Sequence, residues 1–470
     1  MTSYFKSRKL DVSAGDPLIV LMNEKDAIEE GFHIGSKAML CWKDVCLYVT
    51  VDFTDSVVDP GELGMFSEVW EKYRIPSHDM VSLTLSKPPE SLEYIRKKIQ
   101  GHKLNFEEIK KIMEDVSSRS LSTIEITYFA STYYNPGFDD EELFFLTKAM
   151  AETGTVFDFK KGNESIVIAD KHSIGGVPAK GVTPVLVPII ASCGLVIPNT
   201  SSRSITTPAG TSDMLEVIMP VILNKEKILD VVSKHGGCLV WGGGIDLAPA
   251  DDILINIERP LRIESVDKFL VSIIAKKIPM QITKLLIDIP YGEGAKIHSF
   301  EEVNEVESHF ERLCDMFNID VEIYKREVFG PDGNGVGPTL EIRDVLRILD
   351  RHQDRPKALE QLIVDMSGRL LELSGVAKQG EGKALAMSKL ENGEAKKKFW
   401  DIALEQGAQK ELGSEDLQIA EYTFDVKAEK SGVVSRIGIK QTIDIARALG
   451  APFMKESGIY FHKLVGDNVK

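Results

Sequence analysis

Cysteine is scarce in this sequence, and no apolar run is both long and unbroken. The five cysteines are an odd set without Cys-x-x-Cys spacing, which argues against a disulfide framework and a zinc site. They are Cys41, Cys46, Cys193, Cys238 and Cys314. The longest apolar stretch, residues 182–198, is short for a membrane span and is interrupted by prolines, so we expect a buried helix there. The first ten residues lack the apolar core of a signal peptide, and a reducing, cytoplasmic location is expected.

Positive charge is also in deficit. Lysine and arginine number 56 against 72 aspartates and glutamates, which leaves a net charge of −16 at pH 7. Because proteins hold nucleic-acid backbones with Lys and Arg, this balance argues against nucleic acid as the main partner. A small anionic substrate would need a local cluster of donors that overrides the overall negative field.

The first third of the chain is predicted to form a β-rich domain followed by a helical lobe. Residues 1–88 alternate short apolar runs with Gly, Asp and Pro turns, which is typical of short strands. These strands are expected at 18–22, 38–41, 46–53 and 80–85. Residues 89–160 are predicted to be all-helical, with residues 249–279 or so returning to this lobe. Its helices are expected after the capping pair Asn105 and Glu108, and at 122–134 and 139–153.

Strands and helices alternate from residue 161 to 340, which predicts a large α/β domain that binds phosphate. A strand at 166–169 runs through a glycine turn into an apolar helix, which is the βα unit of a parallel sheet. Further strands are expected at 195–197, 238–241, 284–289 and 321–324. Residues 341–470 are predicted to be a C-terminal α+β portion, with short strands at 422–426, 432–437 and 458–462 and a final hairpin that continues beyond residue 470. The predicted class is therefore α/β plus an all-α lobe.

The segment from Lys171 to Val177 follows the first strand of the α/β domain and carries two adjacent glycines. Glycine lets an oxyanion come close to backbone N–H groups at a helix N-terminus. Lys171 adds a positive charge and Ser173 a hydroxyl donor. A tight turn explains two glycines after a strand equally well, so this segment alone does not decide between a turn and an anion site.

The segment from Asn199 to Asp213 has eight hydroxyl side chains in fifteen residues, with Arg203 among them. Hydroxyls are suited to surround phosphate oxygens, and the planar guanidinium is the cation that phosphate recognition favours. A flexible Ser/Thr-rich loop is the alternative, but apolar helices flank the segment directly. We therefore favour a binding loop. Open α/β folds bind ligands at the carboxyl edge of the sheet, so both segments are expected to converge there.

Three weaker candidates lie further along the chain. Asp251 and Asp252 follow a turn at 241–244 and are as well explained by a helix cap as by a catalytic role. Residues 272–277 are predicted to be helical, with one of their two lysines merely solvated. Lys296 lies in a glycine loop after a strand and is expected to project into a cleft.

These motifs together resemble the thymidine and pyrimidine nucleoside phosphorylase family, most closely its AMP (nucleoside 5′-monophosphate) phosphorylase branch. The resemblance covers nearly the whole chain. It rests on HSIGGVP at 172–178, on TSSRSIT at 200–206 with AGTSD after it, and on LAPADD at 247–252. It implies a helical lobe hinged to a larger α/β lobe with substrates between them. It also implies a pentosyltransferase activity, in which inorganic phosphate splits AMP-type nucleotides into ribose 1,5-bisphosphate and free base. The alternative activity is that of a pyrimidine or thymidine nucleoside phosphorylase, which yields a pentose 1-phosphate.

The resemblance also implies roles for individual residues. Phosphate would contact Lys171, Ser173, Ser201 and Thr211. The nucleotide would contact Gly176, Ser202, Arg203, Ser204, Ile205, Thr206, Thr207, Thr211, Ser272 and Lys296. The expected catalytic residues are His172 and Glu264. The branch's proton-donating aspartate aligns with Glu264, and Asp267 and His172 are the alternatives for the proton donor. No metal and no cofactor beyond the co-substrate phosphate are implied, and the partners are these small molecules and further copies of the chain in a homodimer or higher homo-oligomer.

Two departures from the branch pattern keep other activities open. Lys171 is typical of the thymidine-type enzymes, and Pro178-Ala179-Lys180 stands where Pro-Gly-Asn is usual. A phosphoribosyltransferase of anthranilate type would need a Gly-Thr-Gly-Gly-Asp turn, which residues 172–176 do not match. A module that binds these anions without catalysis is the fourth hypothesis.

Overall fold

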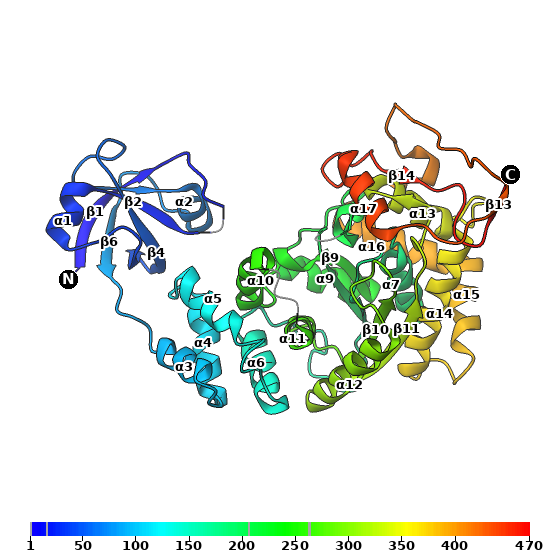
Figure 1. The fold of residues 1–470 in the computed structure, drawn as a ribbon, viewed down its shortest axis with the longest axis horizontal. Helices are drawn as coiled ribbons and strands as arrows, with labels where there is room; N and C mark the ends of the chain where they lie inside the picture. Colours follow the sequence, from blue (N-terminus) through cyan, green and yellow to red (C-terminus); the bar gives the residue numbers. More distant parts are fainter. Residues whose placement is uncertain (1, 16, 205–206, 262–264) are drawn as a thin grey trace. The chain divides into compact units, whose positions relative to one another are not determined.

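The computed structural model describes residues 2–15, 17–204, 207–261 and 265–470 (Figure 1). They fall into two compact units. One comprises Met1–Thr153 and Pro249–Lys268, and the other Gly154–Ala248 and Phe269–Lys470. The segment that returns to the first unit therefore ends at Lys268, earlier than the predicted 279. Among the described residues, no helix combines the length and the apolar character needed to cross a membrane.

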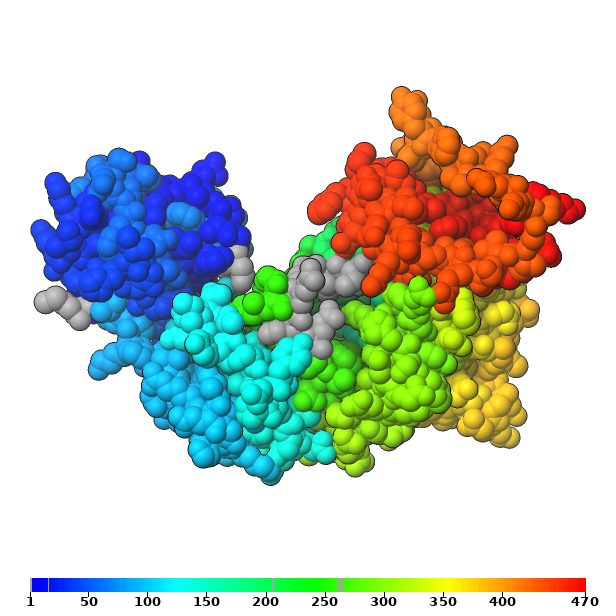
Figure 2. Space-filling model, viewed as in Figure 1, coloured from blue at the N-terminus to red at the C-terminus, as the bar shows by residue number. Residues whose placement is uncertain are grey.

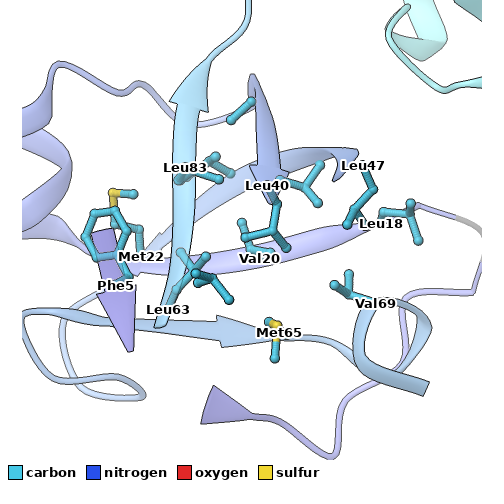
Figure 3. Close-up of a cluster of buried hydrophobic side chains, with 14 of the residues drawn as sticks. Phe5, Leu18, Val20, Met22, Leu40, Leu47, Leu63, Met65, Val69 and Leu83 are labelled. Atoms are coloured by element: carbon cyan, nitrogen blue, oxygen red, sulfur yellow. The ribbon is translucent and has the colours of Figure 1, made fainter. Parts of the chain in front are cut away.

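The first unit begins with a closed six-stranded barrel, in the order β1-β5-β2-β4-β3-β6. Inward-pointing residues such as Val20 and Met22, which alternate along β2, fill the barrel with apolar side chains (Figure 3). The strands are β1 (Thr2–Lys9), β2 (Ile19–Asn23), β3 (Ser36–Trp42), β4 (Val45–Thr54), β5 (Glu62–Met65) and β6 (Met80–Leu85), and two short helices, α1 (Glu24–Glu30) and α2 (Ser67–Tyr73), accompany them.

The four predicted strands of this domain are confirmed within two residues, but β1 and β5 were missed. β1 buries Ser3 and Ser7 beside Phe5, so it shows no apolar alternation, and β5 is only four residues long. The expectation of no disulfide was wrong for one pair. Cys41 and Cys46 face each other across the β3–β4 hairpin and form a disulfide.

Helices complete the first unit. Asn105 and Glu108 form the predicted capping box, in which each side chain accepts the other residue's backbone N–H, and two further helices begin with the same motif. The helices are α3 (Ser91–Ile99), α4 (Phe106–Ser117), α5 (Thr123–Ser131), α6 (Asp140–Glu152) and the returning α10 (Pro249–Leu261). Asp251 and Asp252 lie in the first turn of α10, where carboxylates are favourable.

The second unit is built on parallel strands. β7 (Ala169–Ser173), β10 (Lys284–Tyr291) and β11 (Asp320–Glu327) form one sheet in the order β11-β10-β7. β8 (Ile197–Ser201) and β9 (Gly237–Trp241) pair in parallel beside it. A backbone bridge between Ile168 and Val196 joins the two sheets, so the strands share one direction and one carboxyl edge.

Helices pack around these strands. The apolar stretch that begins at Val182 forms the predicted buried helix, α7 (Val182–Ser192). The others are α8 (Thr211–Leu215), α9 (Lys225–His235), α11 (Val266–Lys277), α12 (Phe300–Met316), α13 (Pro338–Leu349), α14 (Lys357–Leu373), α15 (Gly382–Glu391) and α16 (Glu394–Gln406). Every residue of α13 is buried, and this helix packs against α7 and α8.

The C-terminal residues add short paired strands and one helix to the second unit, where they lie together at its surface (Figure 2). β12 (Gly335–Val336) pairs with β14 (Ile459–Tyr460), and β13 (Gly432–Val433) pairs with β15 (Asn468–Val469). Helix α17 (Ile439–Ala448) lies between β13 and β14 in the chain. The strand predicted at 422–426 does not form: its apolar side chains, such as Phe424, are exposed and have no sheet partner.

Candidate functional site

Strands β7 and β8 end side by side, which brings the two candidate segments to the same sheet edge. The Ala169 N–H donates to the Val196 carbonyl at 2.8 Å. Further along, the Asn199 side-chain amide donates to Asp170 Oδ1 at 2.7 Å. The residues that follow these strands therefore start from neighbouring points of the carboxyl edge, where open α/β folds bind their ligands.

The first segment differs from its prediction in one respect. The strand predicted at 166–169 lies later, at Ala169–Ser173, so Lys171, His172 and Ser173 belong to the end of β7 rather than to a turn. The glycines do not open the helix either, since α7 starts at Val182. Both glycines have positive φ, 90° at Gly175 and 94° at Gly176, which other residues rarely adopt.

Gly176 lies directly against the loop after β10. A Cβ atom at Gly176 would lie 3.1 Å from the backbone nitrogen of Lys296, which is tighter than nine in ten Cβ contacts in proteins. Lys296 itself is exposed. The structure thus brings Gly176 and Lys296, which are 120 positions apart in the printed sequence, to one place.

Asp288 on β10 is the centre of a buried charge cluster at this edge. Its carboxylate is fully buried and accepts the Ser173 hydroxyl at 2.6 Å and Arg326 Nε at 2.8 Å. The Lys180 ammonium lies 3.6 Å from the same carboxylate and donates to Ser173 Oγ. Arg326 also makes a two-bond contact with Asp332, at 2.6 and 2.8 Å. Ser173 is thereby fixed between an anion and a cation.

The electrostatics of this cluster follow from burial. Burial lowers the pKa of Lys171 to about 7, with Asp288 opposing the shift. Burial also holds the pKa of His172 well below its usual range, and the neighbouring lysines, Lys277 first, add to the effect. For Asp288, burial raises the pKa, but Arg326, Lys180 and Lys171 outweigh it and keep the pKa well below its ordinary value. His172 is therefore a neutral imidazole at pH 7, whereas Asp288 is a carboxylate.

The second segment is closed into a loop by Asp213. The Asp213 carboxylate accepts the backbone N–H of Ser204 at 2.7 Å and of Gly210 at 2.8 Å. A Cβ atom at Gly210 would lie 2.5 Å from the Ser202 carbonyl oxygen, so only glycine permits this closure. Ser201 Oγ lies 2.8 Å from Ser212 Oγ, and Thr211 begins α8. Hydrogen bonds thus tie the described residues before Ile205 to those after Thr206.

Arg203 is held in place from two sides. Its guanidinium donates to both oxygens of Glu216, at 2.9 and 2.7 Å, and lies 4.8 Å from the ring centroid of Trp241 at the end of β9. The Arg203 hydrogen bonds lower the pKa of Glu216 to about 2. The arginine is therefore oriented before any ligand arrives.

Helix α11 carries Ser272 and the paired lysines. The prediction that one of these lysines is merely solvated was wrong. Lys276 is partly buried, and Lys277 is only 2% exposed, with its ammonium 2.5 Å from Asp170 Oδ2. Because Asp170 also accepts a hydrogen bond from the Asn199 amide, the ion pair with Lys277 holds Asp170 in place at the junction of β7 and β8.

Some predicted residues cannot be placed in this way. Glu264, Ile205 and Thr206 lie outside the described residues. Asp267 lies in the first turn of α11 and belongs to the first unit. The sequence prediction also missed Asp288, Arg326 and Glu216. A charged residue in the otherwise apolar strand at 284–289 was a usable signal for Asp288, since a fully buried aspartate is rare unless it is paired.

Comparison with known proteins identifies the family of the chain. Residues 165–396 match the α/β domain of a glycosyl transferase family, and residues 92–154 match the helical bundle domain of that family. AMP phosphorylase from Methanocaldococcus jannaschii is 38% identical over 467 residues, which cover 99% of this chain and 91% of the relative. The chain belongs to the AMP phosphorylase family. AMP phosphorylases from Pyrococcus furiosus and Methanospirillum hungatei are 38% and 36% identical, over 99% and 98% of this chain and 91% and 88% of the relatives.

Solved structures extend the likeness at the level of fold. Anthranilate phosphoribosyltransferase from Thermus thermophilus superimposes with a TM-score of 0.55 at 16% identity, covering 67% of this chain and 99% of that one. At this identity the likeness shows the fold alone, which is a helical bundle domain with an α/β domain. Family membership places the chain among the pentosyltransferases.

Proposed function

We propose that the chain splits nucleoside 5′-monophosphates of the AMP type with inorganic phosphate and releases ribose 1,5-bisphosphate and free base. In this reaction the bond from C1′ to the base nitrogen breaks, a bond from C1′ to a phosphate oxygen forms, and the base leaves with the electron pair and takes up a proton. The observation that carries the proposal is the convergence of two anion-binding segments at the carboxyl edge of β7 and β8.

In the proposed site, inorganic phosphate binds to Lys171, Ser173, Ser201 and Thr211. Two lysines at this point support the assignment, because Lys180 donates to Ser173 Oγ and Lys171, with a pKa of about 7, is partly protonated at neutral pH. The Ser173 hydroxyl donates to Asp288 in this structure, so it must turn away from Asp288 to donate to a phosphate oxygen. Holding the phosphate nucleophile next to C1′ replaces a chance encounter in solution. In favourable cases this positioning lowers the activation barrier by about 7 kcal/mol or more.

The nucleotide is proposed to bind along Gly176, Ser202 to Thr207, Ser272 and Lys296, with its 5′-phosphate on Arg203. The fixed guanidinium supports this, since an arginine fork that needs no rearrangement loses little freedom on binding. Protonation of the leaving base is assigned to Glu264, with Asp267 as the alternative. Because His172 is neutral at pH 7, we assign it a hydrogen-bonding role rather than that of the acid.

The proposed reaction needs inorganic phosphate as co-substrate and no cofactor or metal. Assembly into a homodimer or higher homo-oligomer is part of the proposal, on the strength of the family resemblance alone. Light scattering of the purified chain tests it, because a monomeric mass at working concentration would contradict it.

A substrate panel tests the activity. AMP, CMP, uridine and thymidine are each incubated with and without phosphate, and release of the base is measured. We expect phosphate-dependent release from the nucleotides in preference to the nucleosides. Lys171, a residue typical of thymidine-type enzymes, favours a nucleoside phosphorylase as the second candidate, and equal or faster turnover of thymidine would select it.

A further inference from the structure

The carboxylate that orients Arg203 also holds a second cation, which comes from the C-terminal part of the chain. Lys455 Nζ lies 3.2 Å from Glu216 Oε2, the same oxygen that accepts Arg203 Nη1 at 2.9 Å. Because both nitrogens donate to Glu216 Oε2, the distance between them cannot exceed the sum of the two hydrogen-bond lengths. Two positive charges therefore stand next to each other beside the hydroxyl loop.

The position of Lys455 is built into the fold. Its carbonyl accepts the backbone N–H of Thr339 at 3.1 Å, at the start of α13. Helix α13 is wholly buried and packs on α8, which leads directly into Glu216. The backbone of Lys455 and the carboxylate that its side chain contacts are thus tied to the same buried helix.

The ammonium of Lys455 has donors to spare. Glu216 uses one of its three N–H bonds, and the side chain is 38% exposed, so a ligand from solvent can reach it. Arg203 donates to Glu216 from both terminal nitrogens, and its Nη1 also lies 3.5 Å from Asp213 Oδ1, so two of the five guanidinium N–H bonds are left for a ligand. A phosphate monoester, with several oxygens around one phosphorus, can accept from both cations without displacing Glu216.

Two carboxylates face these two cations. Asp213 Oδ2 accepts the backbone N–H groups of Ser204 and Gly210, and Asp213 Oδ1 lies 3.5 Å from Arg203 Nη1. Both cations are therefore paired within the protein, and a phosphate monoester would bind through the N–H donors that these pairs leave over.

We infer that Lys455 is a specificity-determining residue that binds the 5′-phosphate of the nucleotide together with Arg203, in a site that Glu216 holds together. This inference rests on the proposed function and deepens it, because it explains how the site selects a nucleotide over a nucleoside. The ligand class is a phosphate monoester on a pentose.

The test compares Lys455→Met with wild type and with Lys463→Met, which removes an exposed lysine from the same C-terminal part. Measured are the KM for AMP at saturating phosphate, the KM for phosphate at saturating AMP, and the inhibition constant of adenosine. We expect Lys455→Met to raise the KM for AMP about fivefold to tenfold, as for the loss of one partly exposed charge-assisted hydrogen bond. The KM for phosphate, the inhibition constant of adenosine and the kcat should stay within about twofold, and Lys463→Met should resemble wild type.

Two further variants complete the test. Lys455→Arg should restore the KM for AMP to within about twofold, and Lys455→Glu should raise it well beyond the methionine variant because it adds repulsion. An unchanged KM for AMP in Lys455→Met, or an equal rise for AMP and adenosine, would overturn the inference. Failure of the wild-type chain to cleave AMP with phosphate would instead refute the proposed function, so the two outcomes are distinguishable.

Discussion

Replacing Asp288 by asparagine should destabilise the second unit strongly, because this carboxylate compensates several buried cations. It is fully buried, bonds Arg326 Nε at 2.8 Å and Ser173 Oγ at 2.6 Å, and has Lys180 at 3.6 Å. Asparagine has the same shape as aspartate but no charge, and its NH2 group would face hydrogen-bond donors of Ser173, Arg326 or Lys180 where the carboxylate accepted from them. Removing one partner of a buried ion pair costs about 3–5 kcal/mol, and since Asp332 still holds Arg326 we expect about 3 kcal/mol.

The assay is equilibrium unfolding in urea, with Asp320→Asn as the matched control. Asp320 also pairs with a lysine on the same sheet, but its side chain is 63% exposed, so this pair should contribute less than about 1 kcal/mol. Added phosphate should restore part of the stability of Asp288→Asn, because the anion supplies the missing negative charge. Equal unfolding midpoints for the two variants would refute the proposed role of Asp288 as the centre of the charge cluster.

The remaining predictions concern the site and one helix. In the wild type, the KM for phosphate should rise above about pH 7, because Lys171 loses its proton there. In Lys171→Arg this rise should disappear, because arginine stays charged, and the titration of phosphate itself is common to both enzymes. Parallel pH profiles of the two enzymes would contradict this. Gly210→Ala should raise the KM for AMP at least tenfold, because the new Cβ atom would meet the Ser202 carbonyl at 2.5 Å and force the loop apart; unchanged kinetics would contradict this closure. Asn105→Ala should lower the free energy of unfolding by about 1 kcal/mol by removing half of a capping box, without effect on kinetics, and a change in KM would be unexpected.

The sequence allowed much of this fold to be predicted because its elements carry local signals. The capping pair at Asn105 and the apolar β10 were found from capping chemistry and hydrophobic runs alone. β1 was missed because it buries serines, and the strand predicted at 422–426 failed although its residues alternate, because no neighbouring strand pairs with them. Pairing partners are a tertiary property that local patterns do not contain.

The candidate site shows the same division. Ser173 and Arg203 stand in dense local motifs, and such motifs are visible in a sequence. The residues that fix them are less visible. Glu216 is an ordinary acidic residue in its segment, and although Asp288 stands out as a charge in an apolar strand, only the fold brings it to Ser173, 115 positions away. The disulfide between Cys41 and Cys46 escaped prediction for a related reason, since it depends on the register of a hairpin.

The most direct test of the account follows the fate of inorganic phosphate. The chain is incubated with AMP and radiolabelled phosphate, and the sugar product is separated and counted. The account predicts that adenine appears in step with a doubly phosphorylated pentose that carries the label, and that no adenine appears without phosphate. Release of adenine at the same rate without phosphate, or a sugar product free of label, would contradict it.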